Sequence, residues 1–151
     1  KQGIPIRLGS LGALSAARRG EWAFAIESET GQSQALRRLL FDEPLPWTEL
    51  GSSLDEAARW LTAEPGRGVL WVSSDTSLAV WKACQFPGIR AMTTSDAADV
   101  HRASTTLGVN LLVVEPGGKS VFWLKQLATA FRAAGAPRIP DSLVLAMEVA
   151  R

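Results

Sequence analysis

Short, almost entirely apolar runs alternate along this chain with stretches of helical periodicity, and this alternation limits the fold more than any other feature. The runs GVLWV and NLLVV contain no charged residue. Strands of this kind are buried on both faces, as in parallel sheets. Helical patterns between such strands are typical of βαβ units. The sequence therefore predicts a three-layer α/β/α, Rossmann-like domain with a mostly parallel sheet of about five strands.

The elements of this domain can be assigned from residue 21 onward. Strands are expected at residues 22–26, 69–72, 89–93 and 110–114. Helices are expected at residues 33–40, 54–63, 76–85, 97–106, 119–133 and 141–150. Between residues 41 and 53, Pro44 and Pro46 disfavour a central strand, so this segment is expected to be a loop with at most a short edge strand.

Residues 1–20 carry basic side chains and no acidic one. They predict a first strand at residues 4–8 followed by a short helix, or else a surface extension. An amphipathic docking or targeting tail is the alternative. The α/β domain itself is expected to span residues 21–151, including the helix near the end of the chain.

Composition excludes several classes of function. Sixteen Lys and Arg residues against fifteen Asp and Glu give a net charge of +1, so no global field attracts nucleic acid or an anionic membrane. No apolar run reaches the ~20 residues that cross a bilayer. The single cysteine, Cys84, rules out an internal disulfide and a multi-cysteine zinc site, so no metal is expected and a cytoplasmic location fits best. Apolar neighbours predict that Cys84 is buried.

Six tryptophans are many for 151 residues. They cannot all fit easily inside one small core. Some are therefore expected on the surface, at a subunit or partner contact.

The order of features between residues 69 and 138 points to a known family. FPGIRA at residues 86–91 precedes a helix rich in Ala and Arg, an Asn-led strand, the pair Gly117–Gly118, and LATAF with a following Arg-Ile. This ordered set resembles the ribose-5-phosphate isomerase B and galactose-6-phosphate isomerase family. The resemblance implies a homodimer with active sites at its interface and a sugar phosphate as the ligand.

The resemblance also indicates where a site would lie. The family's opening strand ends in a Ser-Asp-His-like turn, and AIESETG at residues 25–31 places Ser28, Glu29 and Thr30 there. The segment IRLGSLG at residues 6–12 is the alternative match. In the loop after the second apolar strand, the family has a Cys-Gly-Thr-Gly-like stretch whose thiolate is the catalytic base. This sequence has Ser73, and the glycines that would hold the phosphate are absent.

Most of the remaining positions depart from the family as well. A serine hydroxyl without a partner is too weak a base for enediol proton transfer. The ring-opening histidine's place falls on Thr106, while the only histidine, His101, is expected to be a surface residue. Arg138 matches a phosphate-binding arginine. Asp75 would repel a phosphate at the helix start unless Arg90 or Arg138 compensates for its charge.

Two functions follow from this pattern. The first is a ligand-binding, regulatory or scaffolding dimer that has lost aldose–ketose isomerase activity. The second is an active isomerase, an intramolecular oxidoreductase, with a rearranged site. There Glu29 would be the base, and Ser73, Ser74 and Thr76 would donate hydrogen bonds to an anion. No cofactor is expected, because no glycine-rich turn suits a dinucleotide.

Overall fold

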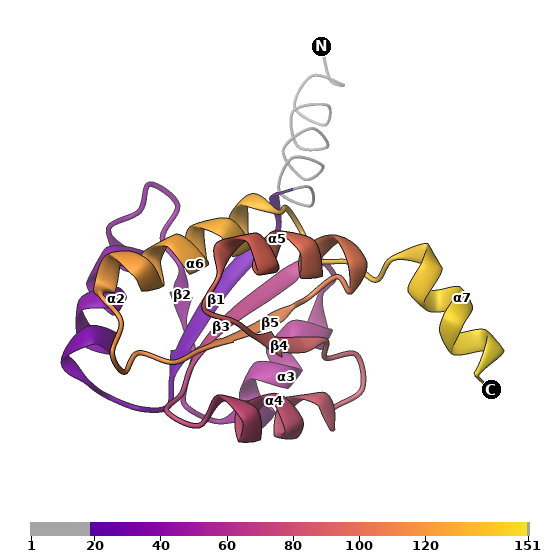
Figure 1. Cartoon of the computed structure of the whole chain (residues 1–151), viewed down its shortest axis with the longest axis horizontal. Coiled ribbons are helices and arrows are strands. Elements are labelled where there is room, and N and C mark those ends of the chain that lie inside the picture. Colours follow the sequence, from indigo (N-terminus) through magenta and orange to yellow (C-terminus); the bar gives the residue numbers. More distant parts are fainter. Residues whose placement is uncertain (1–18, 151) are drawn as a thin grey trace, which may run out of the picture.

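The computed structural model of the chain describes residues 19–150 and contains one sheet of parallel strands (Figure 1). The strands lie in the order β2-β1-β3-β5-β4. Their bounds are β1 Glu21–Ile26, β2 Thr48–Glu49, β3 Arg67–Val72, β4 Ala91–Thr93 and β5 Leu111–Val114. The strand considered at residues 4–8 lies outside the described residues. The predicted parallel sheet is confirmed.

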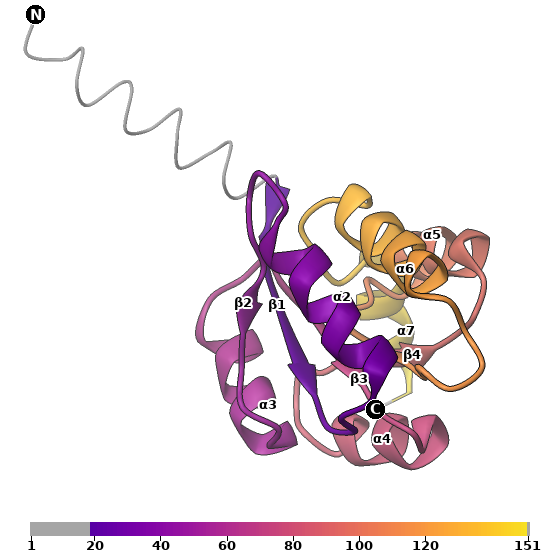
Figure 2. The ribbon, with the colours of Figure 1, turned by 90° about the vertical axis from the view of Figure 1, so that its left-hand side faces the viewer.

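Helices cover both faces of this sheet. Their bounds are α2 Gly31–Phe41, α3 Leu54–Ala63, α4 Thr76–Cys84, α5 Ala97–Thr106, α6 Val121–Ala133 and α7 Asp141–Val149. One apolar cluster joins the sheet to α2, α5 and α6, and a second joins its other face to α3 and α4. Figure 1 and Figure 2 show these two helical layers, and in Figure 1 helix α7 lies away from the sheet. Within residues 19–150, no helix combines the length and apolar character needed to cross a bilayer.

The predicted elements agree with the structure except at some ends. Helix α2 begins two residues earlier than expected, because Thr30 and Ser33 cap it reciprocally through their hydroxyl and backbone groups. Strand β4 begins two residues later than expected, because the Asn110 side chain, and not a neighbouring strand, accepts the N–H of Arg90 at 2.7 Å. The edge strand expected between residues 41 and 53 exists as β2, which pairs with β1.

Burial of the tryptophans follows the prediction. Trp22, Trp47 and Trp71 are buried, whereas Trp81 is 64% exposed and Trp123 is 42% exposed. The prediction for Cys84 was wrong, because this side chain is exposed. In α4 it is Ala79 and Ala83, one turn apart, that face the sheet, and the residue after Ala83 turns away from it.

Candidate functional site at the carboxyl edge of the sheet

The helices that follow the strands change from one face of the sheet to the other between two neighbouring parallel strands, β1 and β3. From β1 the chain enters α2 on one face of the sheet, and from β3 it enters α4 on the other. The loops that follow these strands, residues 27–30 and 73–75, therefore leave the sheet toward opposite faces. In open α/β sheets, ligands bind in the crevice at such a switch point, and we call this region the crevice.

Serine side chains from the two loops meet in this crevice. The Ser28 hydroxyl accepts the backbone N–H of Ser74 at 3.0 Å, and its Oγ lies 3.1 Å from the Ser74 Oγ. Ser73, which is 1% exposed, donates its hydroxyl to Glu27 at 2.5 Å and accepts the N–H of Asp75 at 3.1 Å. The structure thus brings together the three serines predicted from the sequence and adds Glu27.

Both helices that begin at the crevice are capped by their own side chains. The Asp75 carboxylate accepts the N–H of Leu78 at 3.2 Å at the start of α4, and Thr30 caps α2. A helix N-terminus binds an anion through its free N–H groups and its dipole. At the N-terminus of α4 the Asp75 carboxylate already occupies the position of such an anion, beside Thr76. A phosphate is therefore disfavoured there by Coulomb repulsion.

Glu29 lies in an ion-pair network at the edge of the sheet. Its carboxylate is 2.5 Å from Arg37 Nη2, and Arg37 also pairs with Glu49 of β2 at 3.0 Å. The hydrogen bonds that Arg37 donates to these two carboxylates raise the pKa of its guanidinium. Arg37 therefore links α2 to β2 and binds Glu29 there, whereas Glu27 is the carboxylate in contact with Ser73.

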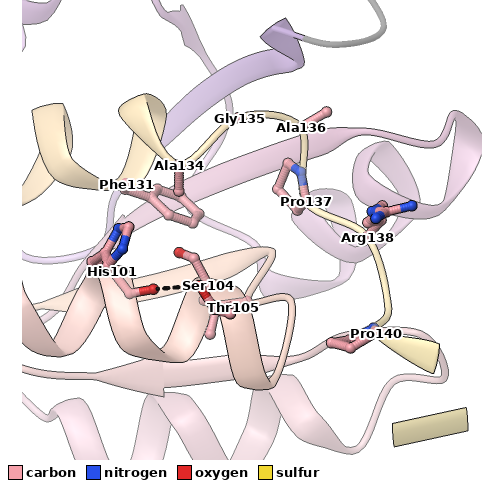
Figure 3. Close-up of a pocket in the computed structure, with 11 residues that line it drawn as sticks. His101, Ser104, Thr105, Phe131, Ala134, Gly135, Ala136, Pro137, Arg138 and Pro140 are labelled. Atoms are coloured by element: carbon pink, nitrogen blue, oxygen red, sulfur yellow. Dashed lines mark hydrogen bonds between the residues drawn. The ribbon is translucent and has the colours of Figure 1, made fainter. Parts of the chain in front are cut away.

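The two predicted arginines lie at the opposite, amino edge of the sheet. Arg90 Nε donates to the carbonyl of Gly108 at 2.8 Å, and burial lowers the pKa of this guanidinium. Arg138 lines a cavity of about 250 Å³ together with the exposed His101 (Figure 3). In Figure 3 these two side chains lie at different ends of the cavity. Within one protomer, the predicted site residues thus lie in two groups, one at the carboxyl ends and one at the amino ends of the strands.

Sequence reasoning missed several polar residues at the carboxyl edge. A cavity of about 230 Å³ lies beside the crevice, at the ends of β3, β4 and β5. It is lined by Thr76, Thr93, Thr94, Ser95, Glu115 and Lys119. Thr93 is the last residue of β4, and the others follow a predicted strand. Of these residues, the sequence predicts only Thr76 as a site residue. Their positions after parallel strands are the sequence signal that identifies them.

Sequence comparison leaves the chain without a match. No protein-family model matches it, and no curated protein is significantly similar to it in sequence.

Solved structures do resemble it. The type B ribose 5-phosphate isomerase of Trypanosoma cruzi superposes with a TM-score of 0.67 and 13% identity, over 87% of this chain and 95% of that one. The ribose 5-phosphate isomerase of Thermotoga maritima gives a TM-score of 0.65 and 13% identity over 74% and 85%. Ribose-5-phosphate isomerase B of Mycoplasma genitalium, solved with bound ribulose-5-phosphate, gives 0.57 and 9% over 74% and 84%. The chain therefore has the fold of the type B ribose-5-phosphate isomerases.

Proposed function

We propose that this chain is a divergent relative of the sugar-phosphate isomerases that binds a small sugar phosphate as a cytoplasmic homodimer without aldose–ketose isomerase activity. The state of Ser73 carries this proposal. Where the family has a thiolate, Ser73 is buried and its hydroxyl donates to Glu27. A serine hydroxyl that donates its own proton to a carboxylate supplies no base for moving a proton between adjacent carbons. What the crevice does offer is hydroxyl and carboxylate groups that suit the hydroxyls of a sugar.

The phosphate of such a ligand requires a cation away from α4. Asp75 occupies the N-terminus of α4, and Arg138 lies at the other edge of the sheet with no ion pair among residues 19–150. A second copy of the chain could bring its own Arg138 to the crevice. The resemblance to isomerases with active sites at a dimer interface supports this arrangement.

The alternative function is an active isomerase with a rearranged site. Glu27 favours it, because this carboxylate lies in the crevice beside Ser73 and a carboxylate can act as a general base. Glu29, the base suggested by the sequence, is less suitable because it pairs with Arg37.

Proton exchange in D2O separates the two functions. With ribose 5-phosphate or another pentose or hexose phosphate, we expect saturable binding but no deuterium at the carbon next to the carbonyl, as followed by NMR. Ser73→Ala should alter the affinity of the chain for the sugar phosphate. Deuterium incorporation abolished by Glu27→Gln, but kept in the exposed control Glu64→Gln, would establish the isomerase. Failure of every sugar phosphate to bind would leave only a scaffolding role.

The dimer can be tested at α7. This helix has no buried residue in one protomer, yet Leu145 is 62% exposed, Met147 47% and Val149 87%. Burying side chains of this kind contributes about 1.5–3 kcal/mol each. We therefore expect α7 to lie in the subunit contact.

We predict that Leu145→Glu weakens dimerisation at least about tenfold, since it forces a charge into an apolar contact. Sedimentation velocity over a range of concentrations measures the change. Ser142→Glu is the control, because it adds the same charge to an exposed polar position of the same helix. Equal dissociation constants for both variants would place the contact elsewhere.

A further inference from the structure

The cavity at the ends of β3, β4 and β5 has features of a ligand site of its own. It is an open cavity of about 230 Å³ whose lining residues are exposed or half-buried. None of Glu27, Ser28, Ser73 and Ser74 lines it. Thr76 is the one predicted site residue that lines it, so its chemistry can be considered apart from Glu27 and the serines and independently of the function proposed above.

A turn between β5 and α6 places two opposite charges in the cavity wall. The N–H of Lys119 donates to the carbonyl of Pro116 at 3.3 Å, and Gly118 has a φ of +72°. A positive φ at the third position of a turn is the type II geometry, which favours glycine. Glu115 and Lys119 lie on either side of this turn, and both line the cavity.

These two charges have no partner in the described part of the chain. Neither Glu115 nor Lys119 forms an ion pair with any residue between 19 and 150, and they do not approach each other within the 4.0 Å of such a pair. An ammonium and a carboxylate that share a small cavity without touching leave space between them for a ligand with complementary groups.

The hydroxyl groups of the wall define what that ligand must offer. Thr93 already donates to the carbonyl of Val113 at 2.8 Å, and Thr94 donates to Asp99 at 3.1 Å. These two can only accept further hydrogen bonds. The hydroxyls of Thr76 and Ser95 have no such bond among residues 19–150. With Lys119 they are the donors of the cavity, while Glu115 and the threonines of β4 and its loop are the acceptors.

We propose that this cavity binds a short-chain sugar acid. Its carboxylate would lie at Lys119, Thr76 and Ser95, because three donors suit a monoanion. Its hydroxyls would donate to Glu115, Thr93 and Thr94. Acceptors spread over two loops suit several hydroxyl groups better than the single ammonium of an amino acid. A phosphate dianion fits less well, because Glu115 would repel the second charge.

Titration of the ¹⁵N-labelled chain with glycerate tests the ligand class. We expect saturable shifts of the amide signals of Thr76, Ser95 and Lys119. Glycerol lacks the carboxylate and propionate lacks the hydroxyls, so both should bind at least about tenfold more weakly. Serine, a zwitterion of similar size, should also bind more weakly. The absence of saturable shifts with glycerate, or tighter binding of serine or propionate, would overturn the proposal.

Substitutions in the wall test the assigned roles. Lys119→Met should weaken glycerate binding at least about tenfold, and Glu115→Gln should reduce the preference for glycerate over propionate. Lys82→Met is the control, since this exposed lysine lies in the last turn of α4 and should leave the affinity unchanged. An affinity for glycerate that survives Lys119→Met would contradict the site.

A pair of glycine variants gives a second test that keeps the lysine. Gly118→Ala strains the turn at its positive φ, whereas alanine at Gly117 would meet only ordinary contacts, at 3.7 Å from the Glu115 carboxylate. We expect Gly118→Ala to weaken glycerate binding and Gly117→Ala to leave it unchanged. Because these variants do not touch the crevice, sugar-phosphate binding there should persist in both. Equal affinities of the two variants for glycerate would refute the role of the turn.

Discussion

Replacing Gly108 by alanine is expected to lower the free energy of unfolding by about 2–5 kcal/mol. Gly108 ends α5 with a φ of +66°, a conformation that costs an L-residue about 1–2 kcal/mol. An added Cβ would also overlap the carbonyl oxygen of Arg138 and lie 2.8 Å from its carbonyl carbon. Because this neighbour is backbone, it cannot rotate away, and overpacking of this kind adds about 1–3 kcal/mol.

Urea unfolding measures this effect, and the chain offers a matched control. Gly88 also has a positive φ, +83°, but the nearest atom to a new Cβ is Thr62 Cγ2 at 3.4 Å. Gly88→Ala should therefore lower the free energy of unfolding only by the cost of the positive φ, about 1–2 kcal/mol. Equal losses in the free energy of unfolding for both variants would show that the backbone at Arg138 moves aside without cost. The wall of the cavity in Figure 3 would then be deformable at that point.

Gly68→Ala is expected to lower the free energy of unfolding by about 2–3 kcal/mol. Its Cβ would overlap the six-membered ring of Trp22 and lie 3.2 Å from Phe131 Cζ. The Trp22 ring cannot shift easily. It packs edge-on against Phe131 with 4.9 Å between ring centroids, contacts Trp47 at 5.8 Å, and donates its Nε1–H to the carbonyl of Arg19 at 2.8 Å.

A double-mutant cycle distinguishes this clash from a general weakness of strand β3. Trp22→Leu removes the ring that the new methyl group meets, so Gly68→Ala should cost less in that background. Gly31→Ala is the control, since a Cβ at Gly31 meets nothing within 4 Å, and it should change stability by less than about 1 kcal/mol. Additive costs of Gly68→Ala and Trp22→Leu would show that the strand, and not the ring contact, sets the effect.

The fold was largely predictable because its signals are local. The apolar runs of β3 and β5 and the two prolines before β2 each act within a few residues of the chain. The exact start of β4 was not predictable. It depends on the Asn110 side chain, twenty residues away, which accepts the N–H of Arg90.

The site was less predictable, because it depends on pairings between distant loops. The sequence places Ser28 and Ser74 after strands, but only the order β1-β3 brings them together across 46 residues. That Ser73 pairs with Glu27 rather than with Glu29 depends on Arg37, which holds Glu29 at the sheet edge. The phosphate-binding role of Arg138 was predicted from the resemblance to a family. In one protomer this residue lies at the amino ends of the strands, away from the serines.

The ends of the sheet set a limit on how this protein can assemble. The outermost strands, β2 and β4, are also the shortest, and β2 is only two residues long, follows Pro44 and Pro46, and carries the Arg37–Glu49 pair. Short, proline-flanked and charged edges resist addition of a further strand. A continuous sheet running through two or more copies is therefore disfavoured, which protects the chain from edge-to-edge aggregation. Within residues 19–150, self-association is expected to use helix surfaces, where most of the exposed large apolar side chains lie.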